Sequence, residues 1–298
     1  MDDIMRRVIP ILITVFSFIA FSLSAQRSAE LGVVIGASSY YGDLSPENAQ
    51  SNTSQYQPSF SFFYRQNLNN TFGFRANLGY GRLSGDDSLS DQQFRQERNF
   101  DFKSSVLELG LIGEINLFGF GAGGNGPRFS PYLFGGVAVF RFNPLTEYEG
   151  QTVELQPLGT EGQGIDGFGN AYRLTQISIP FGAGIKYAIN DHINIGLEIG
   201  FRKTFTDYLD DVSGAYVPYD VLRANNGELA AALGNRTGEF LGTEPVDVQE
   251  GALRGNPGRD DWYMMGGFTL SYTIFSDRGG YGKVGNRRGG KQFGCPTF

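Results

Sequence analysis

Strict alternation between apolar and other residues constrains this chain more than any other feature. In residues 71–81 (TFGFRANLGYG), the side chains of Phe72, Phe74, Leu78 and Tyr80 fall on alternate positions, with glycine, arginine or asparagine between them. Residues 192–202 (HINIGLEIGFR) repeat the pattern. A period of two puts successive side chains on opposite faces of a β-strand, so these stretches predict strands with one apolar face.

Eight segments of this kind follow one another along the chain. They span about 30–40, 58–66, 71–83, 101–117, 131–142, 172–188, 192–204 and 262–275. Most are about ten residues or longer, which is enough for a tilted strand to cross a bilayer. The segment at 131–142 (PYLFGGVAVFRF) is the weakest, because it is apolar on both faces.

The connections between these segments alternate in length. They run to roughly 17, 4, 17, 13, 29, 3 and 57 residues, so every odd connection is long and the even ones, apart from the fourth, are tight turns. Short periplasmic turns and long external loops are typical of outer-membrane barrels. An even number of strands also brings both ends of the barrel segment to the same side of the membrane.

Composition agrees with a barrel that spans a membrane. Of the 298 residues, 18% are charged and 14% aromatic, and 43 are glycine; a soluble domain usually carries about 25% charged residues. Beyond the N-terminal stretch, no run approaches the roughly 20 apolar residues of a membrane helix. We therefore predict an all-β fold, an eight-stranded antiparallel transmembrane β-barrel of the outer-membrane type. The net charge of −7 argues against a nucleic-acid partner.

The two ends of the chain differ from this barrel segment, which we place at residues 26–276. Residues 1–25 join a positive start (Arg6 and Arg7) to an apolar run (VIPILITVFSFIAF) and a small-residue exit (SLSA), which predicts a secretory signal peptide. An uncleaved anchor helix is the alternative. Residues 277–298 form a basic, glycine-rich tail that this topology places in the periplasm.

Four residues of the tail are candidates for docking an acidic periplasmic partner: Arg287, Arg288, Lys291 and Cys295. A solvated tail without such a role is the competing interpretation. Cys295 is the only cysteine of the chain, so it has no internal disulfide partner.

Charged residues recur on the strand faces opposite the apolar set. Four are acids and four are bases, namely Glu30, Arg65, Arg75, Glu108, Glu114, Lys186, Glu198 and Arg202. The interior of an eight-stranded barrel is just wide enough to be filled by side chains. We expect these charges to pair across the lumen, with an ion pathway as the alternative.

The stretch RKTFTDYLDDVSGAY (202–216) holds three carboxylates as the seventh strand ends. In a helix or turn, Asp207, Asp210 and Asp211 would converge, with Thr206 or Asp207 as the N-cap. Structural capping of the rim, a partner contact and a hard-cation site are the three interpretations. The candidate residues at this rim are Thr206, Asp207, Tyr208, Asp210, Asp211 and Ser213.

Catalysis finds little support in the residue types present. His192 is the only histidine and sits beside a tight turn, so neither a serine–histidine–acid triad nor a site with several histidine ligands is expected. We predict a protein that is not an enzyme and has no cofactor and no small-molecule substrate.

Several blocks of the chain resemble the PorG-type outer-membrane protein of the type IX secretion and gliding machinery. They are, in order, ELGVVIGASSYYGDL, LQPLGTEGQG, IPFGAGIKY, EIGFRKTFTDYLDDVSGAYV, RGNPGRDDWY and CPTF. The resemblance implies a non-enzymatic barrel in the outer membrane, in contact with its lipids and with both termini in the periplasm. It also implies a role in anchoring or assembling a periplasmic ring, which consists of a lipoprotein and its partner protein.

Two other functions remain open at this point. One is an ion-binding or enzymatic outer-membrane protein that uses the Asp207–Asp211 cluster. The other is a generic small structural or adhesive barrel.

Overall fold

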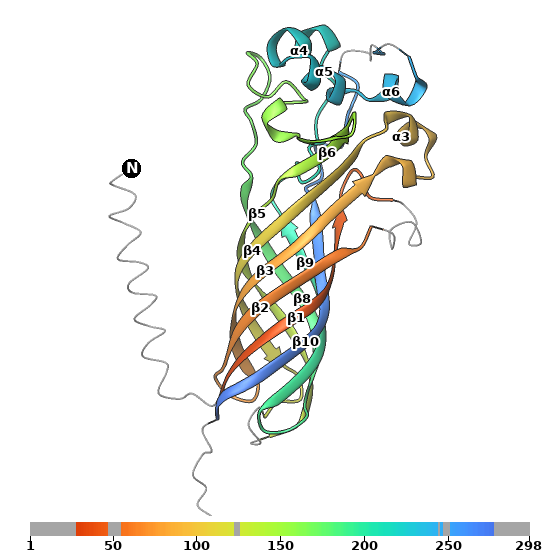
Figure 1. Ribbon diagram of the computed structural model, residues 1–298. Coiled ribbons are helices and arrows are strands. Elements are labelled where there is room, and N and C mark those ends of the chain that lie inside the picture. Colours follow the sequence, from red (N-terminus) through yellow and green to blue (C-terminus); the bar gives the residue numbers. More distant parts are fainter. Residues whose placement is uncertain (1–27, 47–54, 122–125, 244, 247–250, 277–298) are drawn as a thin grey trace, which may run out of the picture.

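Eight long antiparallel strands form a closed barrel in the computed structural model, which describes residues 28–46, 55–121, 126–243, 245–246 and 251–276 (Figure 1). The barrel strands are β1 (Ser28–Tyr41), β2 (Gln57–Asn67), β3 (Phe72–Asp86), β4 (Asp101–Asn116), β5 (Phe129–Arg141), β8 (Thr175–Ala188), β9 (Ile193–Thr204) and β10 (Trp262–Ser276). The prediction of an eight-stranded antiparallel barrel is confirmed. The predicted signal peptide (1–25) and tail (277–298), with Arg287, Arg288, Lys291 and Cys295, lie outside the described residues.

Pairing between the first and last strands closes the barrel. β1 runs antiparallel to β10 from Leu31 opposite Tyr272 to Tyr41 opposite Trp262, and it pairs with β2 on its other side. Closure satisfies the backbone donors and acceptors that an edge strand would leave unpaired, as a strand in a hydrocarbon environment requires.

The two ends of the barrel differ, as the connection lengths predict. Residues 68–71 and 189–192 are tight turns, and in each an asparagine side chain (Asn69 or Asn190) accepts bonds from the backbone N–H groups two and three residues further on. We call this end of the barrel the turn end. The opposite, loop end carries the connections 42–56, 87–100, 142–174 and 205–261 (Figure 1).

The loops at the loop end hold secondary structure that the alternation did not predict. It comprises a hairpin of β6 (Pro144–Tyr148) and β7 (Gln151–Glu154), the short helices η2 (Asp87–Leu89), α3 (Gln93–Arg98) and η3 (Gln156–Leu158), and α4 (Tyr219–Asn226), α5 (Glu228–Gly234) and α6 (Thr237–Leu241). The hairpin extends the sheet beyond the loop end of β4. None of the helices in the described ranges has the length and apolar character needed to cross a membrane.

The outward faces of the barrel strands form an apolar belt. Leu109 on β4 and Phe268 on β10 expose 64% and 74% of their surface. The side chains immediately before Leu109 and after Phe268, on the opposite face of each strand, are buried. A band of exposed apolar side chains around a closed barrel is the surface that lipid tails cover. The strand lengths, the alternation and this belt together make the protein a membrane-spanning barrel.

The segment at 131–142, which is apolar on both faces, forms most of β5, and one of its two apolar faces points into the lumen. Tyr132 and Phe134 are buried there and pack against strands β8 and β9. A Cβ atom on Gly184 would lie 2.6 Å from the ring of Tyr132, and one on Gly200 would lie 2.7 Å from Phe134. Glycine at these positions therefore leaves the space that the two aromatic rings fill.

A larger apolar core closes the loop end of the lumen. Its residues come from the ends of the strands and from the loops of the loop end, and they are Tyr40, Leu44, Leu83, Phe100, Phe102, Val106, Phe140, Phe142, Leu155, Leu209, Val212, Leu233, Tyr263 and Met265. The loops therefore pack onto the mouth of the barrel as an ordered structure, which we call the cap.

Candidate functional site

Glu114 on β4 is the centre of a charge network inside the lumen. Its Oε2 atom lies 2.9 Å from Nε of Arg65 and 3.1 Å from Nζ of Lys186, and its Oε1 atom lies 3.4 Å from Nε of Arg75. These cations stand on β2, β8 and β3, so one carboxylate ties together four strands.

The network continues to the other predicted charges. Arg65 also pairs with Glu30 at 2.9 Å, and Arg75 pairs with Glu198 at 2.7 Å. Nearer the loop end, Arg202 pairs with Glu108 at 3.1 Å. All eight sequence-predicted charges are buried in the lumen, and each belongs to one of these pairs.

Neutral side chains supply the remaining donors of the lumen. The hydroxyl of Tyr132 donates to Glu198 at 2.6 Å, and that of Tyr263 donates to Glu108 at 2.7 Å. Asn67 and Ser271 donate to Glu30. A buried ion pair is tolerated only where hydrogen bonds satisfy its remaining lone pairs. With four acids against four bases, the predicted charges balance.

At the rim, Asp210 and Asp211 turn to different partners. Oδ2 of Asp210 accepts a bond from the hydroxyl of Tyr40 at 2.5 Å, and Oδ1 accepts one from the N–H of Val212 at 3.0 Å. Asp211 has a φ of 66°, in the left-handed region. No helix begins at 206 or 207, so the helical arrangement in which the three carboxylates would converge behind a Thr206 or Asp207 N-cap does not form.

Asp211 belongs to a second buried cluster that joins two loops, 142–174 and 205–261. Its carboxylate accepts bonds from the hydroxyls of Thr160 and Tyr172, and its Oδ2 lies 3.7 Å from Nη2 of Arg254. Arg254 also pairs with Glu161 at 3.1 Å. Glu161 in turn accepts bonds from the N–H groups of residues 213 and 214.

The other predicted rim residues are structural neighbours of these clusters. The N–H of Ser213 donates to Glu161 at 2.8 Å, and the ring of Tyr208 stacks on Tyr172 with 4.6 Å between centroids. The carbonyl of Thr206 accepts a bond from the N–H of Asp261 at 2.9 Å.

Burial raises the pKa of several carboxyl groups of the cap. Desolvation, with the nearby charges of Asp43 and Glu161, raises the pKa of Asp207 to about 7, and its Oδ2 atom is buried without a hydrogen-bond partner among the described residues. Desolvation raises the pKa of Asp211 to about 6 against the opposing charge of Arg254. Burial also raises the pKa of Asp210 and of Asp261, which lie close together.

The arrangement does not favour a hard-cation site at the rim. The carboxyl groups of Asp210 and Asp211 are occupied by protein donors and point to different clusters. Within the described part of the chain, no three histidine, cysteine, aspartate or glutamate side chains are grouped as metal ligands.

The residues that complete the rim clusters could not be identified from any single sequence motif. They come from three separate parts of the sequence: Tyr40, the adjacent Thr160 and Glu161, and the nearby Arg254 and Asp261. A signal was nevertheless present, because these residues lie in the blocks ELGVVIGASSYYGDL, LQPLGTEGQG and RGNPGRDDWY named above. Those blocks meet in space at the mouth of the barrel.

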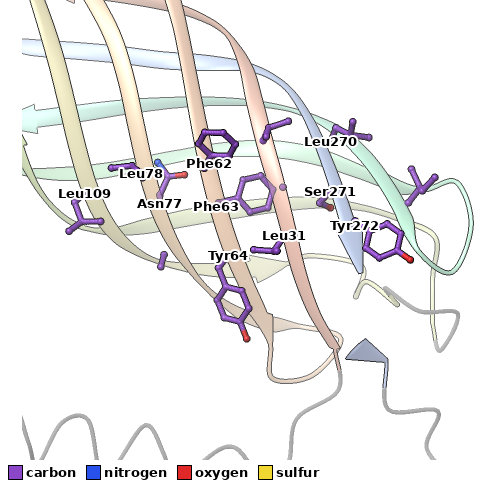
Figure 2. Close-up of a pocket in the computed structure, with 14 residues that line it drawn as sticks. Leu31, Phe62, Phe63, Tyr64, Asn77, Leu78, Leu109, Leu270, Ser271 and Tyr272 are labelled. Atoms are coloured by element: carbon purple, nitrogen blue, oxygen red, sulfur yellow. The ribbon is translucent and has the colours of Figure 1, made fainter. Parts of the chain in front are cut away.

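A shallow apolar groove of about 700 Å³ lies on the outer face of the barrel (Figure 2). Side chains of the belt on β9, β10, β1, β2, β3 and β4 make up most of its lining, among them Leu31, Phe62, Leu78, Leu109 and Leu270, and the buried residues Phe63, Asn77 and Ser271 also contribute. It therefore belongs to the lipid-facing surface.

Several solved barrel structures are similar to this chain at low identity. Ail, the attachment invasion locus protein of Yersinia pestis, has 10% identity and a TM-score of 0.39, with 84% of this chain and 99% of that chain covered. Neisserial surface protein A has 7% identity and a TM-score of 0.38, with 82% and 96% covered. The N-terminal β-barrel domain of OprF from Pseudomonas aeruginosa has 9% identity and a TM-score of 0.33, with 84% and 98% covered.

No curated protein matches the sequence. A family described as "Domain of unknown function (DUF6089)" matches residues 7–232, which is more than half of the chain and includes seven of the eight barrel strands. With its closed barrel, apolar belt and charge-paired lumen, the protein is a small outer-membrane β-barrel protein and belongs to the DUF6089 family.

Proposed function

We propose that the protein is a non-enzymatic structural barrel whose lumen is closed by its own side chains. The observation that carries this proposal is the network around Glu114, in which Arg65, Arg75 and Lys186 converge on one buried carboxylate. The aromatic core of the cap lies over the same lumen at the loop end. A barrel filled in this way offers surfaces to partners rather than a path to solutes.

We further propose that these surfaces serve the type IX secretion and gliding machinery, in which the barrel anchors or assembles a periplasmic ring. The sequence resemblance supports this role, and the resembling blocks at 30–44, 155–164 and 254–263 contribute to the two clusters at the rim. In this arrangement the turn end and both termini face the periplasm, where the ring lipoprotein and its partner protein would bind. The loop end faces the outside.

The ion-binding or enzymatic alternative loses its support at the rim. Asp210 and Asp211 point to separate clusters, and they bind tyrosine, threonine and backbone donors of the protein itself. An adhesive barrel remains the competing function, and it differs from the secretion role in where the partners bind.

Affinity purification of a tagged barrel tests the secretion role. After mild detergent extraction, the ring lipoprotein and its partner protein should co-purify, and deletion of the barrel should abolish cargo export. A barrel that purifies alone from a strain with normal export after deletion would reject the proposal. Loss of surface attachment in that same strain would assign the adhesive function instead.

A version that lacks residues 277–298 refines the same experiment. If the tail holds the ring, this version inserts normally but fails to restore export to the deletion strain. The matched control is Tyr219→Phe, which removes only an exposed hydroxyl bond at the loop end and should leave both insertion and export intact.

A further inference from the structure

Basic side chains stand immediately beyond the apolar belt on three neighbouring strands. On β3 the outward positions run Leu78, Tyr80 and then Arg82, and on β5 they run from Val139 to Arg141. Between them on β4, Lys103 is the basic residue at the loop end of the outward face. All three basic side chains are exposed.

Strand register brings the two arginines to either side of β4. Arg82 is opposite Ser105, and Arg141 is opposite Leu107. With strands about 4.8 Å apart and a rise of about 3.4 Å per residue, the Cα atoms of Arg82 and Arg141 are about 12 Å apart. Two extended arginine side chains cover that separation, so both guanidinium groups can reach one doubly charged headgroup.

The arginines are available for a ligand. Neither Arg82 nor Arg141 makes an ion pair or side-chain hydrogen bond among the described residues. Lys103 pairs with Glu147 at 2.8 Å, but both side chains are about two-thirds exposed, and such surface pairs contribute little. Because Lys103 and Glu147 together carry no net charge, Arg82 and Arg141 give the patch a net charge of two positive units.

The apolar surface beneath this patch leads into the groove of Figure 2. Leu78 and Leu109 face each other across β3 and β4, and both line the groove. Leu78 is four residues from Arg82, or about 14 Å along the strand. A cationic patch above an apolar groove matches an amphiphile with an anionic head and an acyl tail.

We propose that β3, β4 and β5 carry a binding site for a phosphorylated lipid of the outer leaflet. Its phosphates lie on Arg82 and Arg141, and an acyl chain follows Leu78 and Leu109 into the groove. Guanidinium groups bind phosphate oxygens through paired hydrogen bonds, which gives arginine an advantage over lysine at such a site. The site requires the barrel to be in a membrane with its loop end outward, and it does not require the secretion role.

Lipid binding by the full-length barrel tests this site. The purified protein in detergent is titrated with diphosphorylated lipid A and with fully dephosphorylated lipid A, and bound lipid is counted by native mass spectrometry. The wild-type barrel should bind the diphosphorylated form preferentially. The R82Q/R141Q variant should lose about thirtyfold in affinity, since each basic residue near a membrane surface contributes roughly a factor of five.

Arg128→Gln is the matched control, because Arg128 is equally an exposed arginine but lies at the turn end. It should bind as the wild type does, and the heat-dependent gel mobility of all variants shows that they are folded. The R82K/R141K variant should bind with intermediate affinity.

Three results would overturn the proposal. They are equal binding of the dephosphorylated lipid, an R82Q/R141Q affinity equal to that of R128Q, or displacement of the lipid by inorganic phosphate at matched concentration. The last result would identify a free anion as the ligand.

Discussion

The hydroxyl of Tyr40 lies 2.5 Å from Oδ2 of Asp210, which joins the end of β1 to the 205–261 loop. The same hydroxyl lies 3.0 Å from Oδ1 of Asp261, just before β10. A phenol has a single proton to donate, so the second contact requires a protonated carboxylic acid. Burial raises the pKa of both aspartates, which agrees with one shared proton in this triad.

Removal of the Tyr40 hydroxyl should loosen the cap. Tyr40→Phe leaves two buried carboxyl groups without the hydroxyl that both contact, and we expect a loss of about 1–3 kcal/mol in the stability of the cap. Limited proteolysis of the 205–261 loop in the folded barrel measures this loss as faster cleavage. Tyr219→Phe is the control, because its hydroxyl bonds to Glu228 in solvent and its loss should change cleavage little. Equal cleavage in both variants would contradict the role of Tyr40.

The cap should lose stability as the pH rises. The pKa of Asp211 is raised to about 6 and that of Asp207 to about 7, from a usual value of 3.8, so the folded cap binds more protons than the unfolded loop. The stability that this proton binding gives the cap is complete below about pH 4. It is lost as the pH rises through the pKa values of the two carboxyl groups in the folded cap. Amide hydrogen exchange in 205–216 should therefore become faster, after correction for the intrinsic rate, between pH 5 and pH 8.

Asp207→Asn separates this effect from a general response of the barrel. The amide imitates the protonated acid, so the variant should show a shallower dependence on pH above pH 6. A wild-type cap whose protection is constant or increases with pH would show that these carboxyl groups do not govern it.

The lumen network should depend strongly on Glu114. Glu114→Gln leaves Arg65, Arg75 and Lys186 with one fewer buried counter-charge, and breaking a buried pair in this way costs about 3–5 kcal/mol. Urea unfolding of the barrel in lipid vesicles gives the free energy. Glu147→Gln is the matched control, since its exposed pair with Lys103 should contribute at most about 1 kcal/mol. Similar losses for the two variants would show that the lumen pairs are not structural.

The space for Phe134 depends on Gly200. Gly200→Ala would put a Cβ atom 2.7 Å from that ring, and we expect overpacking to cost about 1–3 kcal/mol. Phe134→Leu in the same chain should recover most of the loss, because the contact is with the ring. Gly113→Ala, whose nearest contact would be an ordinary 3.7 Å, should be neutral in the same unfolding assay. Failure of the double variant to recover would place the strain elsewhere.

The barrel could be predicted from the sequence because its determinants are local. Alternation in residues 71–81 and 192–202 fixes which side chains face lipid, and the tight turns at 68–71 and 189–192 fix which strands are neighbours. The same alternation identified the lumen charges. The pairs of Arg65 were not predictable, because its pair with Glu30 depends on the register of β2 against the neighbouring β1, and its pair with Glu114 depends on the position of β4, two strands away.

The cap could not be predicted in the same way. The spacing of Asp207, Asp210 and Asp211 suggested a common site, but Asp210 and Asp211 bind different partners in the structure. Their partners Tyr40, on β1, and Arg254, more than 40 residues further along the same loop, are distant in the sequence. Such contacts follow from the tertiary fold rather than from local spacing.

Electrical recording from the purified barrel in planar lipid bilayers tests the central claim most directly. The ion pairs of Glu114 and the aromatic core of the cap fill the lumen, so we predict insertion without a steady single-channel conductance. Insertion is verified separately by protease protection of the same preparation. A stable, reproducible open-channel current from the folded wild-type barrel would contradict the account of a closed structural barrel.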